Sequence, residues 1–216
     1  MNAELTIVIP AKNEVEMLPR LLESLCRQDY PLMRSTKIFL ADAGSTDGTP
    51  ELALSFAGRL DIEVIPGGLP SVGRNAGARR AESAYVLFID ADMELKDTTL
   101  VRRTMELAGR RKLHCATTNI WCSQGGLRDQ VLYIANNIAQ YGSFLVRPFS
   151  TGMFMLFEKK TFDRLGRDQV NDTMCYGVSL LGVKNEKVGH SILSVHVASM
   201  GADSKSFSRT CNGECR

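Results

Sequence analysis

The fold of this chain is decided by the stretch YVLFIDAD, residues 85–92, in which five apolar or aromatic residues end in two carboxylates. An unbroken apolar run followed at once by acids predicts a strand that is buried on both faces and ends in a polar site. Ligands of open α/β sheets bind at the C-terminal ends of the strands. Asp90 and Asp92 point to one side of an extended chain and repel each other unless a cation lies between them. Such oxygen ligands suit Mg2+ or Mn2+, and the alternative is that Asp92 or Asp97 caps the following helix.

Strands and helices alternate in the chain before this stretch. Apolar runs predict strands at 5–10, 37–42 and 62–65, and segments with helical spacing or helix-start signals follow them at 15–28, 49–58 and 74–83. Repeated alternation of this kind predicts parallel strands joined by right-handed crossovers. We therefore expect an α/β protein with three layers, α/β/α, built on a mainly parallel, Rossmann-like nucleotide-binding sheet.

The second half of the chain is less regular. Helices are predicted at 97–109, 127–141 and 159–165, and strands at 113–121, 152–157 and 192–197. The aliphatic stripe of the helix at 127–141 predicts core packing, and the alternative is a peripheral membrane contact. Beyond Asp168 the periodicity fades, so we expect residues 1–166 to form the main domain. Residues 167–216 are then an atypical C-terminal segment that ends in an irregular tail.

Composition and charge describe an ordinary soluble globular protein. Of the 216 residues, 44% are hydrophobic and 23% are charged, and the net charge of +2 is too small to favour a nucleic-acid partner. No apolar run is long enough for a transmembrane helix, and the N-terminus lacks a signal sequence, so we expect a cytoplasmic protein. The six cysteines have no framework spacing, which favours reduced thiols.

Three residues close predicted strands and are expected to meet at one edge of the sheet. Pro10, Asp42 and Asp90 end the first, second and fourth predicted strands. Asp42 can accept hydrogen bonds from a base or a ribose hydroxyl, although an aspartate before a Gly/Ser loop also forms an Asx turn. Arg74 follows a glycine-rich loop at an expected helix start, where a phosphate is favoured; the alternative is a solvated arginine.

Four motifs in this order resemble the inverting GT-A glycosyltransferases, the large second family of nucleotide-sugar-dependent enzymes. The motifs are VIPAKNE at 8–14, ADAGSTDGT at 41–49, GRNAG at 73–77 and FIDAD at 88–92, and TGMF at 151–154 extends the match more loosely to residue 166. The resemblance implies a GT-A fold and a nucleoside-diphosphate sugar as the donor. Residues 1–166 are then the nucleotide-sugar-binding and catalytic domain, and residues 167–216 the acceptor side.

The resemblance also implies roles for individual residues. Asp42 and Arg74 help to hold the nucleotide, and Asp90 and Asp92 hold the diphosphate through Mn2+ or Mg2+. His196 lies where some relatives supply a third metal ligand, although a lone histidine on a strand is more often structural. The remaining nucleotide-sugar contacts that the resemblance implies are Pro10, Ala11, Glu14 and Ala91. Of these, Glu14 is equally compatible with a solvated acid at a helix N-terminus.

The catalytic base is the least clear part of the sequence. Inversion requires a base that takes the proton of the acceptor hydroxyl, and the family places this base in an acidic pair ahead of a helix. In place of a clear Glu-Asp pair, this chain offers Asp172 as the first candidate and Asp168 as the second. The alternative is that both are ordinary loop acids.

The sequence thus predicts a hexosyl- or related glycosyltransferase, of the kind used in cell-envelope polysaccharide synthesis. It is expected to act, with inversion and metal assistance, on a glycan, a lipid-linked or a small-molecule acceptor, in the cytoplasm or at the inner face of the membrane. The first alternative is a module that binds nucleotide sugars but transfers them slowly or not at all, because residues 168–216 do not complete the acceptor side. A sugar nucleotidyltransferase is less well supported, since PAKNE at 10–14 lacks the glycines of a phosphate loop.

Overall fold

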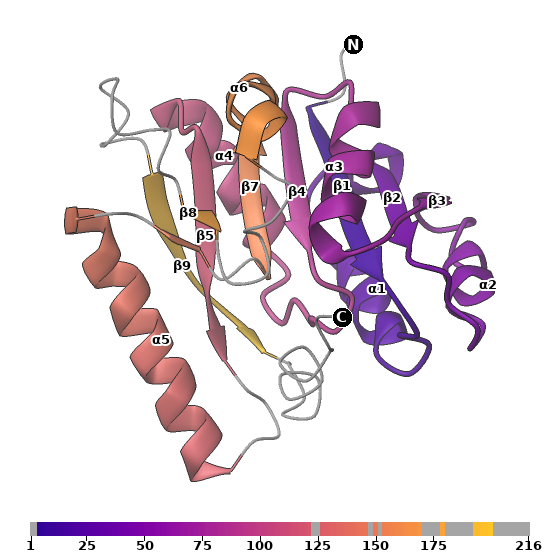
Figure 1. Cartoon of the computed structure of the whole chain (residues 1–216), viewed down its shortest axis with the longest axis horizontal. Coiled ribbons are helices and arrows are strands. Elements are labelled where there is room, and N and C mark those ends of the chain that lie inside the picture. Colours follow the sequence, from indigo (N-terminus) through magenta and orange to yellow (C-terminus); the bar gives the residue numbers. More distant parts are fainter. Residues whose placement is uncertain are drawn as a thin grey trace.

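One seven-stranded sheet forms the centre of the structure, in the order β3-β2-β1-β4-β7-β5-β9 (Figure 1). The computed structural model describes residues 4–121, 126–146, 149–150, 153–169, 178–179 and 192–200. The strands are β1 (Leu5–Ala11), β2 (Lys37–Asp42), β3 (Asp61–Pro66), β4 (Tyr85–Ile89), β5 (Cys115–Trp121), β7 (Phe154–Glu158) and β9 (Ile192–Met200). The pairs β1–β2, β1–β4, β2–β3 and β5–β9 are parallel, and β7 lies antiparallel between β4 and β5. The mainly parallel sheet that the sequence predicts is confirmed.

Helices follow the strands along the chain. Within the described residues they are α1 (Leu18–Cys26), α2 (Thr49–Leu54), α3 (Pro70–Arg80), α4 (Leu100–Arg111), α5 (Leu127–Val146) and α6 (Lys159–Gln169), with a 3-10 turn at Met33–Ser35. The short strands β6 (Phe149–Ser150) and β8 (Val178–Ser179) form a separate antiparallel pair. The irregular tail expected at 201–216 lies outside the described residues.

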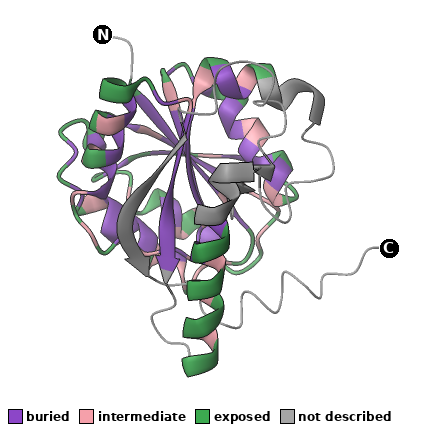
Figure 2. Ribbon diagram, turned by 90° about the vertical axis from the view of Figure 1, so that its left-hand side faces the viewer, coloured by how far each residue is buried: buried purple, intermediate pink, exposed green. Residues whose placement is uncertain are grey.

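Alternate residues of the central strands face two different layers of helices. On β1, Ile7 and Ile9 pack into one apolar cluster with the leucines of α1, while Val8 packs into a second cluster with Ala78 of α3. This separation follows from the period of two in a strand, where successive side chains point to opposite faces. All three β1 side chains are fully buried, and the sheet is buried throughout its centre (Figure 2). The predicted α/β/α arrangement is therefore confirmed.

Two glycines bring α3 close to the sheet. Gly73 and Gly77 are four residues apart, so they lie on the same face of the helix. A Cβ atom on Gly73 would lie 3.1 Å from the Cβ of Ala41, and one on Gly77 would lie 2.7 Å from Cγ2 of Val8 and closer still to its Cγ1. Larger residues would therefore hold the helix farther from β1 and β2.

Helix α5 turns two polar residues, Asn137 and Gln140, inward and five aliphatic residues outward. The carboxamide of Asn137 donates to the carbonyl of Ile120 at 2.9 Å and accepts from its amide at 3.3 Å, and Gln140 is also buried. The aliphatic side chains that are 41–79% exposed are Leu127, Val131, Leu132, Ile134 and Ile138. Figure 2 shows the described turns of α5 largely exposed. The expectation that this stripe packs in the core is wrong, because the hydrogen bonds to β5 determine which face is turned inward. No helix in the described part of the chain is long and apolar enough to cross a membrane.

Candidate functional site

The direction of the strand order reverses between β1 and β4, and this reversal locates the candidate site. β2 pairs with one side of β1, where Asp42 lies beside Ala11, and β4 pairs with the other side in the same direction. Open α/β sheets bind ligands at the carboxyl ends of the strands at such a reversal. Pro10, Asp42 and Asp90 are therefore brought to one edge of the sheet, as the strand–helix alternation predicts.

Asp42 forms an Asx turn through only one of its two carboxylate oxygens. Oδ2 accepts hydrogen bonds from the amides of Gly44 and Ser45, both at 3.1 Å. Gly44 has a φ of 77°, a left-handed conformation that glycine adopts without strain. Oδ1 is buried and has no hydrogen-bond partner among the described residues. Because an unsatisfied buried acceptor is costly, Oδ1 is suited to accept a hydrogen bond from a ligand N–H or O–H.

Asp47 joins the loop after β1 to the loop after β2. Its Oδ2 accepts from the amide of Val15 at 3.1 Å, and its Oδ1 accepts from the amide of Thr49 at 3.0 Å and from the Thr49 hydroxyl at 2.6 Å. Desolvation alone would raise the pKa of Asp47, but these hydrogen bonds outweigh it and hold the pKa below its ordinary value. The Thr49 hydroxyl oxygen in turn accepts from the amide of Glu14 at 2.8 Å, so the Thr49 side chain holds the backbone of Glu14.

Asn13 makes a second connection between the same two loops. Its amide donates to Oγ of Ser45 at 2.8 Å, and its Oδ1 accepts from the amide of Thr46 at 3.0 Å. Asn13 has a φ of 55°, a conformation that asparagine tolerates better than most residues. Sequence reasoning assigned no role to Asn13 or Asp47. The signal was the occurrence of Asn, Asp, Ser and Thr in both motif loops, since these side chains bind nearby backbone groups.

A partly buried ion pair links α3 to the end of β4. Arg74 is 5% exposed, and its Nη2 donates to Oδ1 of Asp90. The prediction that Arg74 begins a helix is wrong, because α3 already begins at Pro70, whose fixed φ suits the first helical turn. Arg74 thus lies in the second turn and offers a guanidinium group rather than a helix N-terminus. The positive charge of this group is partly offset by the carboxylate of Asp90.

Asp92 follows β4 in a tight turn in which the amide of Met93 donates to the carbonyl of Asp90 at 3.2 Å. Ala91 and Met93 are buried, and Asp92 between them is half-buried. Within the described ranges, no group of three or more His, Cys, Asp or Glu side chains is arranged to hold a metal ion. A divalent cation here would take one or two carboxylates from the protein and its other ligands from phosphate or water, which is the usual arrangement for Mg2+.

The remaining predicted residues are not joined to this group by the described structure. β9, which carries His196, lies three strand spacings from β4, or about 14 Å at the usual strand separation. Asp168 lies in the last turn of α6, and the side chains of both residues are outside the described part. Asp172 lies outside the described residues altogether. The roles of these three residues stay predictions.

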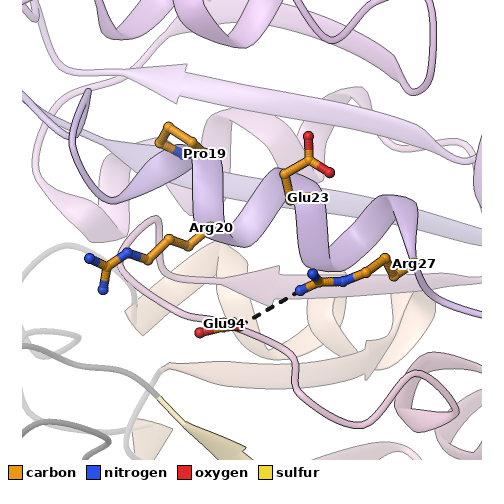
Figure 3. A pocket seen from close by; sticks show the side chains of 5 residues that line it. All are labelled: Pro19, Arg20, Glu23, Arg27 and Glu94. Carbon is orange, nitrogen blue, oxygen red and sulfur yellow. Dashed lines mark ion pairs between the residues drawn. The ribbon is translucent and has the colours of Figure 1, made fainter.

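A shallow cavity of about 260 Å³ lies elsewhere, on the outer face of α1. Its lining comes from α1 and from the segment that follows Asp92 (Figure 3), and the residues are Pro19, Arg20, Glu23, Arg27 and Glu94. Arg27 and Glu94 form an ion pair at 3.6 Å across it. The opposite charges and the exposed ion pair describe a solvated surface rather than a second site.

These features define a class of protein: a doubly wound α/β fold whose strand ends carry an acid at β2, an arginine–acid pair at β4 and two interlocked loops. Comparison with known families makes the assignment specific. The model of the family "Glycosyl transferase family 2" matches residues 6–166, and the chain belongs to this family.

Known relatives match about half of the chain. The chain is 29% identical over 99 residues to the poly(ribitol-phosphate) beta-N-acetylglucosaminyltransferase TarS of Staphylococcus aureus Mu50, a match that covers 44% of this chain and 17% of TarS. It is 32% identical over 125 residues to the uncharacterized glycosyltransferase YibD of Escherichia coli K12, covering 55% of this chain and 35% of YibD. The chain therefore spans about a sixth to a third of the length of these relatives.

Solved structures share the fold over most of the chain. TarS 1–349 of S. aureus superposes with a TM-score of 0.62 at 15% identity, covering 96% of this chain and 63% of that one. The mannosyltransferase PcManGT of Pyrobaculum calidifontis, solved with GDP-Man and Mn2+, superposes with a TM-score of 0.67 at 21% identity, covering 94% and 57%. The GT-A type of fold that the sequence resemblance implies is confirmed.

Proposed function

We propose that this chain is a glycosyltransferase that moves a sugar from a nucleoside diphosphate to an acceptor hydroxyl, with inversion at the sugar carbon. The observation that carries the proposal is the convergence of Asp42, the Arg74–Asp90 ion pair and Asp92 at the ends of neighbouring parallel strands. Membership of glycosyl transferase family 2 supports the same chemistry. Solved relatives hold UDP-GlcNAc in TarS and GDP-Man in PcManGT, so UDP- and GDP-sugars are the donors to test.

The nucleoside end of the donor is assigned to the loops after β1 and β2. Oδ1 of Asp42 is a buried acceptor that a base N–H or a ribose hydroxyl would satisfy. The contacts of Asn13 and Asp47 hold the two loops together before any ligand arrives, which reduces the entropy lost on binding. Pro10, Ala11 and Glu14 lie in or beside these loops and are proposed as further nucleotide contacts.

The diphosphate end is assigned to the turn after β4. Arg74 offsets the charge of Asp90, and Asp92 places a second carboxylate beside Ala91. Because a diphosphate is itself anionic, two carboxylates and one arginine suit it only with a cation between them. The carboxylates fit Mn2+ or Mg2+ held mainly by Asp92, with Asp90 assisting through ribose or water. Such an ion, when bound, offsets the negative charge that grows on the leaving diphosphate.

The acceptor end is assigned to the C-terminal segment. Transfer breaks the bond between the anomeric carbon and the diphosphate oxygen, which keeps the electron pair. The acceptor oxygen bonds to the opposite face of the sugar and gives its proton to a carboxylate base. Asp172 is proposed as this base, with Asp168 as the second candidate and His196 as a further ligand of the metal.

Titration calorimetry with UDP and GDP, with and without Mn2+, tests the donor site. Mn2+ is expected to tighten binding to the wild type, and Asp92→Asn should lose at least about tenfold of that gain, since one ion–carboxylate contact contributes more than 1.4 kcal/mol. Asp61→Asn is the matched control, because Asp61 begins β3 at the opposite edge of the sheet. Equal metal dependence in wild type and Asp92→Asn would contradict the role of Asp92.

Transfer assays with the same proteins separate an enzyme from a binding module. Release of UDP or GDP that depends on an added acceptor supports transfer, and loss of this release in Asp172→Asn supports the proposed base. Metal-dependent nucleotide binding without acceptor-dependent release would instead favour the binding-module alternative. If the protein shows no nucleotide binding and no acceptor-dependent release, both the enzyme and the binding module are excluded.

We further propose that the exposed face of α5 makes a peripheral contact with a membrane surface, where a lipid-linked acceptor would be reached. The face is aliphatic, and the charged residues of α5 are Arg128 and Asp129 in its first turn. Wild type should sediment with phosphatidylglycerol-containing vesicles, and Ile138→Glu should not. Leu54→Glu makes the same kind of change at an aliphatic residue of α2 that is 50% exposed, and this variant should sediment like wild type. Equal sedimentation of the two variants would count against this contact.

A further inference from the structure

The segment that leaves the acidic motif is attached along helix α1. This segment, residues 92–98, is called the strap below. Near its start the amide of Leu95 donates to Oγ of Ser24 at 3.0 Å. Near its end the carbonyl of Asp97 accepts from Nε2 of Gln28 at 2.9 Å. Ser24 lies in the last turn of α1, and Gln28 lies two residues beyond Cys26, where the helix ends, so the C-terminal end of α1 and the residues just after it hold most of the strap.

Ser24 is suited to this contact because it is fully buried. Its hydroxyl donates to the carbonyl of Leu21 at 2.7 Å, which orients the oxygen lone pairs toward the amide of Leu95. Leu95 is itself 1% exposed, so its amide has no access to bulk water. A buried amide without an acceptor is costly, and Ser24 supplies that acceptor.

Gln28 fixes the other end of the strap to the start of α4. It is 7% exposed, and while Nε2 donates to Asp97, Oε1 accepts from the amide of Val101 at 3.0 Å. Val101 is the second residue of α4, where backbone amides have no intrahelical acceptor. One side chain thus serves both the strap and the helix that follows.

Buried side chains within the strap add to these contacts. Met93 and Leu95 are 0% and 1% exposed and pack in the cluster that contains the leucines of α1, while Asp92 and Glu94 are half-buried. This alternation orients Asp92 away from the core that holds its neighbours. Its carboxylate position therefore depends on where α1 holds the rest of the strap.

We propose that Ser24 and Gln28 are positioning residues that hold Asp92 where the cation and the donor diphosphate bind, an inference that rests on the proposed role of Asp92. Neither residue touches the reacting groups. The effect passes through the backbone of the strap, in which Ser24 holds the position three residues after Asp92 and Gln28 the position five residues after it.

A third contact, between the C-cap residue of α1 and the strap, provides an internal comparison. Arg27 and Glu94 form an ion pair at 3.6 Å, with side-chain exposures of 55% and 29% (Figure 3). Exposed ion pairs of this length contribute little, because both groups remain solvated. If the buried hydrogen bonds rather than the exposed ion pair fix the strap, then replacing Arg27 should change amide exchange in the strap much less than replacing Ser24.

Hydrogen exchange and calorimetry on the whole chain test the proposal. In Ser24→Ala, amide exchange of the strap should quicken by about tenfold or more, as expected when a buried amide loses its acceptor. Mn2+-dependent UDP affinity should fall by a similar factor, while metal-free UDP affinity stays within twofold of wild type. Gln28→Met, which keeps the volume but removes both hydrogen bonds, should act in the same direction.

Two variants serve as controls. Ser55→Ala removes a hydroxyl that makes the same bond to a carbonyl three residues back, at 2.6 Å, but no bond to a distant amide. Arg27→Ala removes the exposed ion pair with Glu94 and leaves the hydrogen bonds of Ser24 and Gln28 in place. Both should match wild type in strap exchange and in metal-dependent affinity.

Two results together overturn the proposal. In Ser24→Ala, amide exchange quickens uniformly or only outside the strap, and metal-dependent UDP affinity equals that of wild type. Ser24 would then have only a structural role. If the wild type itself shows no metal-dependent UDP binding, the donor role of Asp92 fails separately. The positioning of the strap is then decided by exchange alone, with selective quickening of residues 92–98 supporting it and unchanged exchange overturning it.

Discussion

Replacing Gly77 with alanine tests the close contact between α3 and the sheet. The added Cβ would lie 2.7 Å from Cγ2 of Val8 and closer still to Cγ1. Val8 is fully buried on the central strand and β-branched, so its two methyl groups cannot both rotate away. The helix must therefore move outward, and Arg74 moves with it relative to Asp90.

The size of the effect follows from two opposing terms. Overpacking a core costs about 1–3 kcal/mol, and replacing a helical glycine by alanine returns about 0.5–1 kcal/mol. The expected net loss is about 1–2 kcal/mol of unfolding free energy, or roughly 2–8 °C in Tm for a chain of this length. UDP affinity should fall as well, since the ion pair at the site is carried on the displaced helix.

Urea and thermal unfolding measure the stability terms against a matched control. Gly109→Ala makes the same substitution inside α4, where an added Cβ meets no atom within 4 Å, and should raise stability by about 0.5–1 kcal/mol. The double variant Gly77→Ala/Val8→Ala should lose less stability than the two single variants together, because the overlapping methyl groups are gone. If Gly77→Ala is as stable as Gly109→Ala, the close packing of α3 on β1 is refuted.

Two further predictions concern carboxylates outside the acidic motif. Asp47→Asn keeps one acceptor oxygen but turns an amide group toward the N–H of Val15. Amide exchange at Val15 should therefore quicken, and UDP affinity should fall about fivefold, which corresponds to roughly 1 kcal/mol. Unchanged exchange at Val15 would refute the link between the loops. Glu158 lies at the far end of the sheet, where burial raises its pKa but hydrogen bonds with Thr161 and His114 outweigh that effect and leave the pKa lowered. The unfolded state then binds the proton more tightly than the folded state. The stability that wild type gains over Glu158→Gln, measured by urea unfolding, should therefore be full above about pH 5 and should shrink as pH falls through about 4.3 and below. A stability difference that grows on acidification would contradict the lowered pKa.

Buried parallel strands were the most predictable part of the fold, because they are written as continuous apolar runs. The run at 85–89 is β4 residue for residue, and Asp42 is the last residue of β2. Once the strands are known to be parallel, the convergence of Asp42 and Asp90 follows without further information. The fold and the donor end of the candidate site were therefore accessible from the order of the elements.

Contacts between distant segments were not accessible in this way. Periodicity showed that α5 has an aliphatic face but not which way it turns, since that depends on the hydrogen bonds of Asn137 to Ile120. The start of α3 was misplaced because the glycines and prolines of residues 66–73 suggested a loop, whereas residues 70–73 are the first turn of a helix that packs on β1. The sequence gives no indication of the role of Ser24, because a serine inside an amphipathic helix does not reveal that it will bind the distant amide of Leu95.

The two acids of the motif, alike in the sequence, acquire different surroundings through these distant contacts. Two glycines let α3 approach the sheet, and this approach brings Arg74 to Asp90, which lies on the β4 side of the site. Asp92, two residues later, belongs to the strap, and α1 sets its position from the other layer of helices. A cation held by Asp92 would thus sit beside two different carboxylates. The charge of Asp90 is offset by Arg74 from the layer of α3, and Asp92 is positioned from the layer of α1. This division explains why a short Asp-x-Asp pattern is weak evidence alone: the helices on both faces of the sheet make its two carboxylates unequal.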